Sequence, residues 1–187
     1  MRMWAFADRY GQGQTFPQFL DGSTAPNIQL WRDVYRLARV PEWAAADVRA
    51  MAAPCRLVVL SEDWCGDAIN SIPPLAKLVE QHPDRLDLRL LGRDSHPDIM
   101  DRYLTGTARS IPVVIVLDEL MEELGWWGPR PRALQQWVME QRAAGMDKKT
   151  LYPEIRKWYA RDKGETTIRE ILEIVQTSKR RNVIGGM

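Results

Sequence analysis

The residue with the most reactive chemistry in this 187-residue chain is Cys65, in the stretch SEDWCGDAIN from Ser61 to Asn70. It follows a short apolar run and precedes a segment with helical spacing. A cysteine at the start of a helix faces unpaired backbone N–H groups and the positive end of the helix dipole, and both favour the thiolate. Because the thiolate is the nucleophilic form of cysteine, we expect thiol chemistry at Cys65.

A second active-site cysteine is missing. The residue three positions after Cys65, where a resolving cysteine would share its helix face, is Ala68. The other cysteine, Cys55, lies at the opposite end of the same predicted strand, roughly 16 Å or more away at about 3.3 Å per residue. A disulfide needs Cα atoms within about 7 Å, so this strand excludes an internal bridge. We expect Cys55 to be a small buried core residue.

The carboxylates around Cys65 and the helix terminus act in opposite directions on the pKa of its thiol. Three carboxylates flank the thiol: Glu62, Asp63 and Asp67. Each would raise the pKa of the thiol by about 0.4 unit from about 8 Å in a water-like dielectric, whereas the helix terminus supplies roughly 0.3–2 kcal/mol in the other direction. We therefore expect a modestly reactive thiol with a pKa near about 8.5, unless Arg93 or Arg109 lies close to it. Asp67 could equally serve only to stabilise the first turn of its helix.

Apolar spacing predicts the elements that position this stretch. Strands are expected at 55–60, 85–91, 111–118 and 122–127; the first is buried on both faces, the second has a solvated face or an edge position, and the last two form an antiparallel hairpin. Helices are expected at 27–40, 42–52, 66–80, 98–104, 131–143, 153–160 and 168–178. This order describes an α/β sandwich with a four-stranded mixed sheet, finished by the hairpin and a covering helix at 131–143.

Three local features complete the prediction of elements. Residues 1–25 should form an irregular arm that packs on the body through its aromatic side chains. Pro73 and Pro74 should interrupt and kink the helix at 66–80. Thr167 and Glu170 have the spacing of a capping box at the start of the last helix.

Two motifs in this order of elements resemble the thioredoxin superfamily. Trp64-Cys65-Gly66-Asp67-Ala68 lies between a buried strand and a helix, and Ser110-Ile111-Pro112 opens the next strand but one. In that superfamily the Ile-Pro bond is cis and lies opposite the cysteine. The tail LYPEIRKWYARDKGETTIREILEIV resembles that of a little-characterised bacterial branch with W-C-G-D after the strand.

The resemblance covers about residues 40–178 and implies a thioredoxin-like three-layer α/β sandwich. We expect residues 1–187 to form a single domain with a core at about 40–145. A helical extension at 1–40 would precede that core, and a helical extension with two additional helices at 146–187 would follow it.

The resemblance also implies roles for individual residues. Cys65 would be the catalytic residue, and the substrate-binding residues would be Trp64, Gly66, Asp67, Ile111 and Pro112. Thioredoxins carry a buried acid on the central strand that assists proton transfer, but the matching position here is Val59. The sequence Cys-Gly-Asp-Ala also differs from the Cys-Gly-Phe-Ser of monothiol glutaredoxins, which disfavours a metal-cluster role.

The composition of the chain argues against two classes of binding partner. The 26 basic and 25 acidic residues give a formal net charge of +1, so we expect neither nucleic acid nor a membrane surface as a partner. The longest apolar run, 111–117, is far shorter than the about 20 residues of a membrane helix, and MRMWAFADRY lacks the core of a signal peptide, so a cytoplasmic location is expected.

His82 and His96 lack neighbours at metal-ligand spacing, and no metal is expected. The basic cluster at 179–181 is expected to be a solvated helix end.

Three hypotheses for the function, each from a different class, are consistent with the sequence. The first is monothiol thiol–disulfide exchange or deglutathionylation, with a protein disulfide or glutathione disulfide as partner, no bound cofactor, and glutathione as a possible co-substrate. The alternative is a catalytically inactive binding module that uses the cis-proline groove and a rim of tryptophans. Adjacent Trp126 and Trp127 on a strand cannot both face inward, so one should be exposed. A purely structural role through the C-terminal helices is the third hypothesis.

Overall fold

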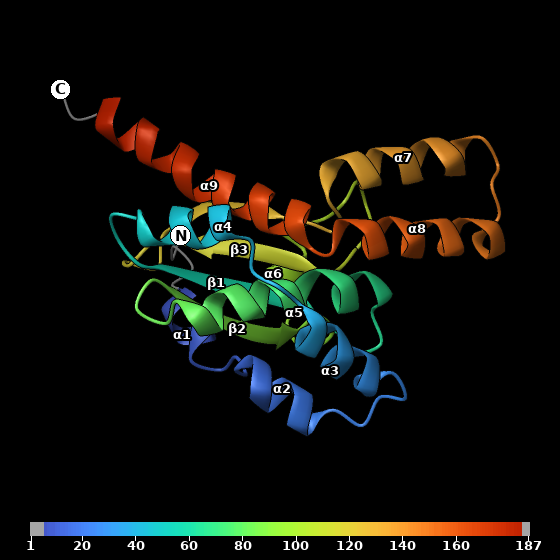
Figure 1. Cartoon of the computed structure of the whole chain (residues 1–187), viewed down its shortest axis with the longest axis horizontal. Helices are drawn as coiled ribbons and strands as arrows, with labels where there is room; N and C mark the ends of the chain where they lie inside the picture. The colour runs from blue at the N-terminus through green and yellow to red at the C-terminus, as the bar shows by residue number, and fades with distance from the viewer. Residues whose placement is uncertain (1–5, 185–187) are drawn as a thin grey trace.

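A four-stranded mixed sheet lies at the centre of the molecule (Figure 1). The computed structural model describes residues 6–184, with side chains described for residues 6–177. The strands lie in the order β2 (Leu86–Gly92), β1 (Cys55–Ser61), β3 (Val113–Leu117) and β4 (Glu123–Trp127). β2 is parallel to β1, whereas β3 is antiparallel to both β1 and β4. The predicted strands, the hairpin and the edge position of β2 are confirmed.

The helix that follows β1 is continuous. α5 (Gly66–Gln81) runs through Pro73 and Pro74, so the predicted interruption is wrong. Both proline rings are buried, and tertiary packing offsets the missing backbone hydrogen bonds. Part of this packing comes from far along the chain, because a Cβ at Gly164 would lie 2.5 Å from the ring of Pro74.

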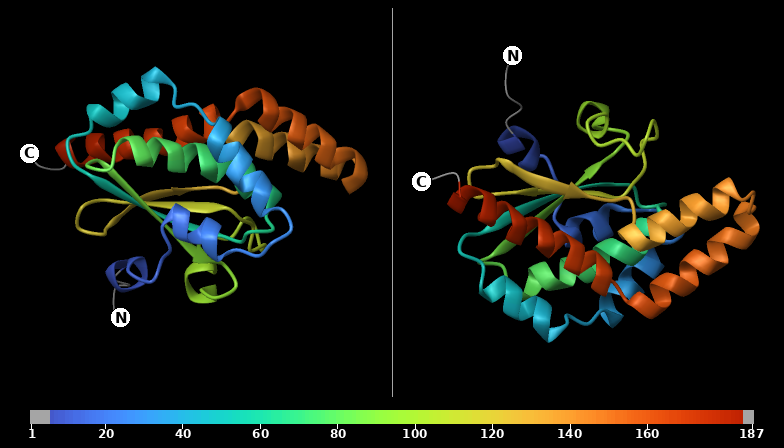
Figure 2. Two further views of the ribbon diagram at one scale, coloured as in Figure 1. Left: turned by 60° about the horizontal axis from the view of Figure 1, so that its bottom comes forward. Right: turned by 90° about the horizontal axis from the view of Figure 1, so that it is seen from above.

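Helices cover one face of the sheet, as both views in Figure 2 show. These are α3 (Ile28–Leu37), α4 (Glu42–Arg49), α5 and α9 (Glu165–Ile184), and α9 contacts β3, β4, α4 and α5. The predicted apolar stripe of this last helix is buried: Ile168, Ile171, Leu172 and Val175. The predicted capping box is wrong, because α9 begins at Glu165 and places Thr167 and Glu170 inside the helix.

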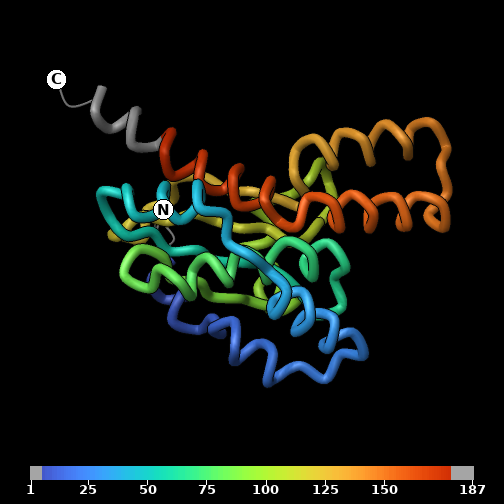
Figure 3. The backbone as a smooth tube through the Cα atoms, in the orientation of Figure 1, coloured from blue at the N-terminus to red at the C-terminus, as the bar shows by residue number. Residues whose placement is uncertain are grey.

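A helical hairpin projects from the sheet (Figure 3). It consists of α7 (Arg132–Ala143) and α8 (Lys148–Asp162). The two helices bury a small separate core: Leu134, Val138, Leu151, Ile155 and Tyr159. α7 was expected to cover the sheet, but its apolar face packs on α8, and α9 covers the sheet in its place.

The N-terminal arm is helical rather than irregular. It contains α1 (Phe6–Tyr10) and α2 (Phe16–Gly22). Thr15 and Gln18 form a capping box at the start of α2, and this Thr-x-x-Gln signal is visible in the sequence. Between the two helices, the backbone of Gln14 pairs with that of Leu90 on β2, with N···O distances of 2.9 and 2.8 Å. The arm therefore covers part of the edge of the sheet.

The short helix α6 (Pro97–Met100) ends four residues earlier than predicted and lies with α1 on the opposite face of the sheet (Figure 2). Among the described residues, no helix combines the length and apolar character needed to span a membrane. The basic cluster at 179–181 lies outside the residues whose side chains are described.

Candidate active site

Cys65 is the N-cap residue of α5 and lies beside the segment that enters β3. Its Sγ donates a hydrogen bond to the carbonyl oxygen of Ile111 over 3.4 Å. The peptide bond between Ile111 and Pro112 is cis. The structure thus brings Cys65 together with two of the residues predicted to bind substrate, although 46 positions separate the cysteine from Ile111.

The thiol of Cys65 is buried, with 6% of the residue exposed. Burial raises the pKa of this thiol to about 11, because it disfavours the charged form. A hydrogen bond from the backbone N–H of Ala68 acts in the opposite direction. The predicted pKa near about 8.5 is therefore wrong. The prediction weighed the charges and the helix terminus but omitted desolvation, which is the largest cause here.

Asp67 does not face solvent. Its carboxylate accepts two hydrogen bonds from the guanidinium of Arg130, over 2.9 Å from Nε and 2.6 Å from Nη2. The hydroxyl of Tyr159 donates a third hydrogen bond to the same carboxylate over 3.1 Å. Arg130 is held from its other side by Gln135, whose Oε1 accepts over 2.9 Å.

The sequence did not predict that Arg130 and Tyr159 belong to this site. Arg93 and Arg109 were considered as cations near the thiol, whereas the guanidinium that acts on it is that of Arg130. One local signal precedes this arginine: Gly128-Pro129-Arg130-Pro131 is a rigid loop at the end of a strand. Tyr159 carries no such signal, since it lies inside a long helix.

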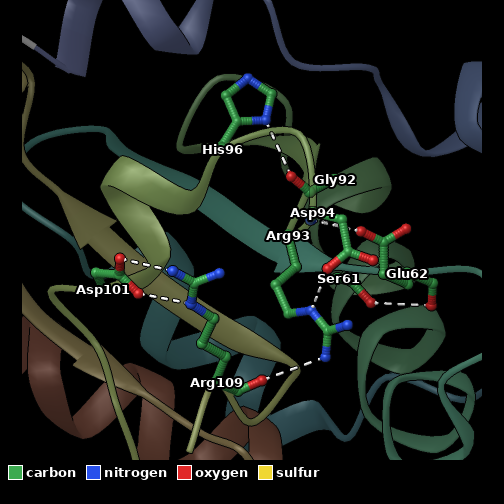
Figure 4. A network of polar contacts seen from close by, with 8 residues as sticks. All are labelled: Ser61, Glu62, Gly92, Arg93, Asp94, His96, Asp101 and Arg109. Carbon is green, nitrogen blue, oxygen red and sulfur yellow. Dashed lines mark hydrogen bonds and ion pairs between the residues drawn. The ribbon is translucent and has the colours of Figure 1, made fainter.

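The rim of the site is formed by Trp64 and two arginines. Trp64 is 54% exposed, and the guanidinium of Arg93 lies 5.0 Å from the centre of its ring. Arg93 also binds the carboxylate of Asp94 over 2.8 Å and the carbonyl oxygen of Arg109 over 3.3 Å (Figure 4). Arg109 in turn makes two hydrogen bonds to Asp101, over 2.6 and 2.7 Å. This network fixes the loop after β2 against the segment that leads to Pro112.

The carboxylates before Cys65 hold neighbouring segments in place. Glu62 accepts a hydrogen bond from the backbone N–H of Asp94 over 2.9 Å (Figure 4), and Asp63 accepts one from the hydroxyl of Ser23 over 2.6 Å. Gly66, the remaining predicted substrate-binding residue, is exposed, and an added Cβ there would meet nothing within 4 Å. The surface next to the cysteine is therefore open at Gly66 and at Trp64.

The histidines lie apart from this chemistry. Nδ1 of His96 is 3.0 Å from the carbonyl oxygen of Gly92 (Figure 4), and His82 caps the far end of α5. In the part of the chain that the structure describes, no three His, Cys, Asp or Glu side chains gather in a group that could hold a metal ion.

The two adjacent tryptophans of β4 face opposite ways, as predicted. Trp126 is 39% exposed and packs edge-on against Tyr103, whereas Trp127 is 5% exposed. Nε1 of Trp127 donates to the carboxylate of Glu170 over 2.7 Å. The same carboxylate accepts from the backbone N–H of Arg132 over 3.0 Å, so it caps the start of α7.

Comparisons with known proteins agree on one fold. A family model described as thioredoxin matches residues 13–148. No curated protein matches the chain. A crystal structure of a protein of unknown function from Pseudomonas aeruginosa is 22% identical, with a TM-score of 0.74, and the match covers 94% of this chain and 99% of that chain. An HIV epitope-scaffold is 20% identical, with a TM-score of 0.74, and the match covers 93% of this chain and 99% of that chain. At these identities the two structures show a shared thioredoxin-like fold.

Proposed function

Because the chain belongs to the thioredoxin family, we propose that it carries out monothiol thiol–disulfide exchange with Cys65 as the nucleophile. One observation carries this proposal. The sulfur of Cys65, at the N-terminus of α5, lies 3.4 Å from the carbonyl oxygen of Ile111, next to Pro112. A thiol in this position can attack a disulfide in a peptide that lies along the backbone before β3.

The reaction consists of two exchanges. In the first, the Cys65 thiolate attacks one sulfur of a protein–glutathione disulfide; a bond to the glutathione sulfur forms, the original disulfide bond breaks, and the protein leaves as a thiolate that takes a proton from water. In the second, the thiolate of another glutathione attacks the Cys65 adduct. The products are glutathione disulfide and free Cys65, so one free glutathione is oxidised and the protein sulfur is reduced to a thiol.

The predicted substrate-binding residues have different parts in this proposal. The backbone at Ile111 and Pro112 would pair with an extended substrate, and the exposed ring of Trp64 would cover it. Gly66 leaves space at the start of α5 for the substrate to approach. Asp67 would contribute through its backbone alone, because Arg130 and Tyr159 occupy its carboxylate.

The burial of Cys65 makes the exchange slow at neutral pH. With a pKa of about 11, only a very small fraction of the Cys65 thiol is ionised at pH 7. The rate should therefore be proportional to the small fraction of Cys65 that is ionised and should increase with pH.

The proposal is tested by turnover of a glutathionylated peptide in the presence of reduced glutathione. The wild-type protein is expected to release the peptide thiol above the uncatalysed rate, and Cys65→Ser should abolish this activity. Cys55→Ser is the matched control, since it removes the other buried sulfur at the far end of β1. Activity that persists in Cys65→Ser would rule out Cys65 as the nucleophile.

A second function, peptide binding without turnover, is supported by the combination of a buried, protonated thiol with an exposed Trp64. Such a module would bind S-methyl glutathione, which cannot exchange, equally well in Cys65→Ser and in the wild type. It would show no turnover in either protein. Loss of this binding in Trp64→Ala would place the ligand on the rim described above.

A further inference from the structure

A closed path of contacts connects Cys65 to the loop after β4. The sulfur of Cys65 contacts the carbonyl oxygen of Ile111. The next residue, Pro112, packs against Gly128: an added Cβ at Gly128 would lie 2.2 Å from the carbonyl oxygen of Pro112. Two residues later the same loop supplies Arg130, whose guanidinium binds Asp67. The path returns to its start, because Asp67 lies two residues after Cys65.

The pair of Asp67 and Arg130 is withdrawn from solvent. The side chain of Arg130 is 11% exposed and that of Asp67 is 15% exposed, and the hydroxyl of Tyr159 completes the cluster. Removing two charges from water is costly, so a buried ion pair often contributes no net stability compared with apolar residues of the same size. Stability therefore explains this pair poorly, and its place beside a thiol points to an electrostatic role.

Both members of the pair act on the thiol. Burial is the largest cause that raises the pKa of Cys65; of the two charges, Asp67 raises this pKa and Arg130 lowers it. Burial also raises the pKa of Asp67 itself, whereas Arg130 and, on α7, Arg142 are cations that lower it. Tyr159, from α8, faces the same carboxylate but is neutral at physiological pH, since burial raises its own pKa. With the ion pair intact, the charges of Asp67 and Arg130 oppose each other at the sulfur.

We propose that Asp67 is a positioning residue that holds Arg130 beside Cys65 and masks its charge, so that a smaller fraction of the buried thiol ionises in the resting protein. Arg130 is the counter-ion that stabilises the thiolate when the charge of Asp67 is removed. This inference rests on the proposed function, because it assigns a regulator to the same nucleophile. The inference concerns only how readily Cys65 ionises, whereas the proposed function requires turnover of a disulfide substrate.

The experiment compares the rates at which iodoacetamide alkylates Cys65 at pH 8, with Cys55→Ser as the background. Asp67→Asn removes the negative charge and keeps a side chain of similar shape. We expect the rate to rise about two- to thirtyfold, the range for one charge about 8 Å from the sulfur at effective dielectric constants from about 80 to 20. The rate should fall back toward the background value when Arg130→Gln is added, because the gain depends on the unmasked guanidinium.

Two comparisons separate this role from a structural one. Glu62→Gln removes a solvent-screened carboxylate outside the cluster and should raise the rate less than Asp67→Asn does, by no more than about 2.5-fold. If Asp67→Asn acted only by loosening the packing, the rate would stay high in the double variant with Arg130→Gln. That result would overturn the proposal, and so would an unchanged rate in a folded Asp67→Asn protein. Should Asp67→Asn fail to fold, Arg130→Gln alone tests the same coupling: it removes the cation that lowers the pKa of Cys65, so the rate should fall, and an unchanged rate would overturn the proposal.

Failure of this inference and failure of the proposed function give different results. Alkylation requires no disulfide substrate, so the Asp67→Asn comparison can succeed in a protein that shows no turnover. Conversely, turnover that depends on Cys65 but whose nucleophile alkylates at the same rate in Asp67→Asn would leave the function intact and overturn the role of Asp67.

Discussion

At Cys65, desolvation outweighs the surrounding charges. A solvent-screened carboxylate shifts a thiol pKa by only about 0.4 unit from about 8 Å, whereas burial shifts the pKa of an ionisable group by up to several units. Only 6% of Cys65 is exposed, so burial dominates and raises the pKa of its thiol to about 11. The reactivity of the site is therefore decided by how far the sulfur is from water.

This burial predicts the pH profile of the thiol. In Cys55→Ser, the second-order rate of alkylation of Cys65 should rise about tenfold for each pH unit between about pH 7 and 10, because the thiolate fraction does so below a pKa of about 11. The measurement is the rate with iodoacetamide across this range, with a small model thiol under the same conditions as reference. A plateau below about pH 9 would contradict the account and would mean that the sulfur is better solvated or better paired than the structure shows.

Among the secondary-structure elements, the prediction succeeded where local pattern and packing agree. The run Cys55–Leu60 became β1, and the hairpin around Asp118 formed where two apolar runs lie close together in sequence. The prediction failed where a contact with a residue far along the chain determines the local structure. Pro74 sits inside a continuous helix because Gly164 packs on its ring, and Glu170 bonds to Trp127 and Arg132 rather than to its own helix terminus. Neither contact can be seen in a short stretch of sequence.

The loop between β4 and α7 depends on a glycine at position 128. Gly128→Ala places a Cβ 2.2 Å from the carbonyl oxygen of Pro112 and 3.1 Å from the Cα of Val113, at a φ of +135°. We expect a loss of more than about 3 kcal/mol in the free energy of unfolding, from the clash and the unfavourable φ together. Urea denaturation measures this loss.

Gly145→Ala is the matched control for this substitution. Gly145 also has a positive φ, +85°, but an added Cβ would meet nothing within 4 Å. It should cost only about 1 kcal/mol, the penalty for the backbone conformation alone. Equal losses in the two variants would show that the contact with Pro112 does not constrain the loop.

Across the whole molecule, the site is assembled from segments that the sequence keeps far apart. Cys65 and Asp67 come from the start of α5, whereas Arg130 lies 63 positions after Asp67 and Tyr159 lies 92 positions after it. The motif around the cysteine predicted the fold and the pairing with Pro112. It could not predict the ion pair, because nothing in the local pattern says which arginine a buried carboxylate will meet.

The C-terminal helices are required for folding, because α9 packs against β3 and β4. α9 covers one face of the sheet, and within its described part, up to residue 177, it buries four apolar side chains: Ile168, Ile171, Leu172 and Val175. At about 1.5–3 kcal/mol for each side chain, their loss is comparable with the whole stability of a domain, about 5–15 kcal/mol. Truncation after Gly145 should therefore abolish cooperative thermal unfolding, as followed by circular dichroism.

A shorter truncation, after Thr177, is the control because it keeps all four side chains. This protein should still unfold cooperatively. A protein truncated after Gly145 that unfolds as cooperatively as the full chain would show that α9 is dispensable, in conflict with its place against β3 and β4.

The role of Cys65 as the nucleophile is tested by identifying the cysteine that forms a mixed disulfide with glutathione. The protein is incubated with glutathione disulfide at about pH 9, the exchange is stopped with acid, and the adduct is mapped by mass spectrometry of peptides. We expect one glutathione on Cys65 in the wild type and in Cys55→Ser, and none in Cys65→Ser. An adduct on Cys55 in Cys65→Ser at the wild-type level, or no adduct on Cys65 in the wild type, would contradict Cys65 as the nucleophile.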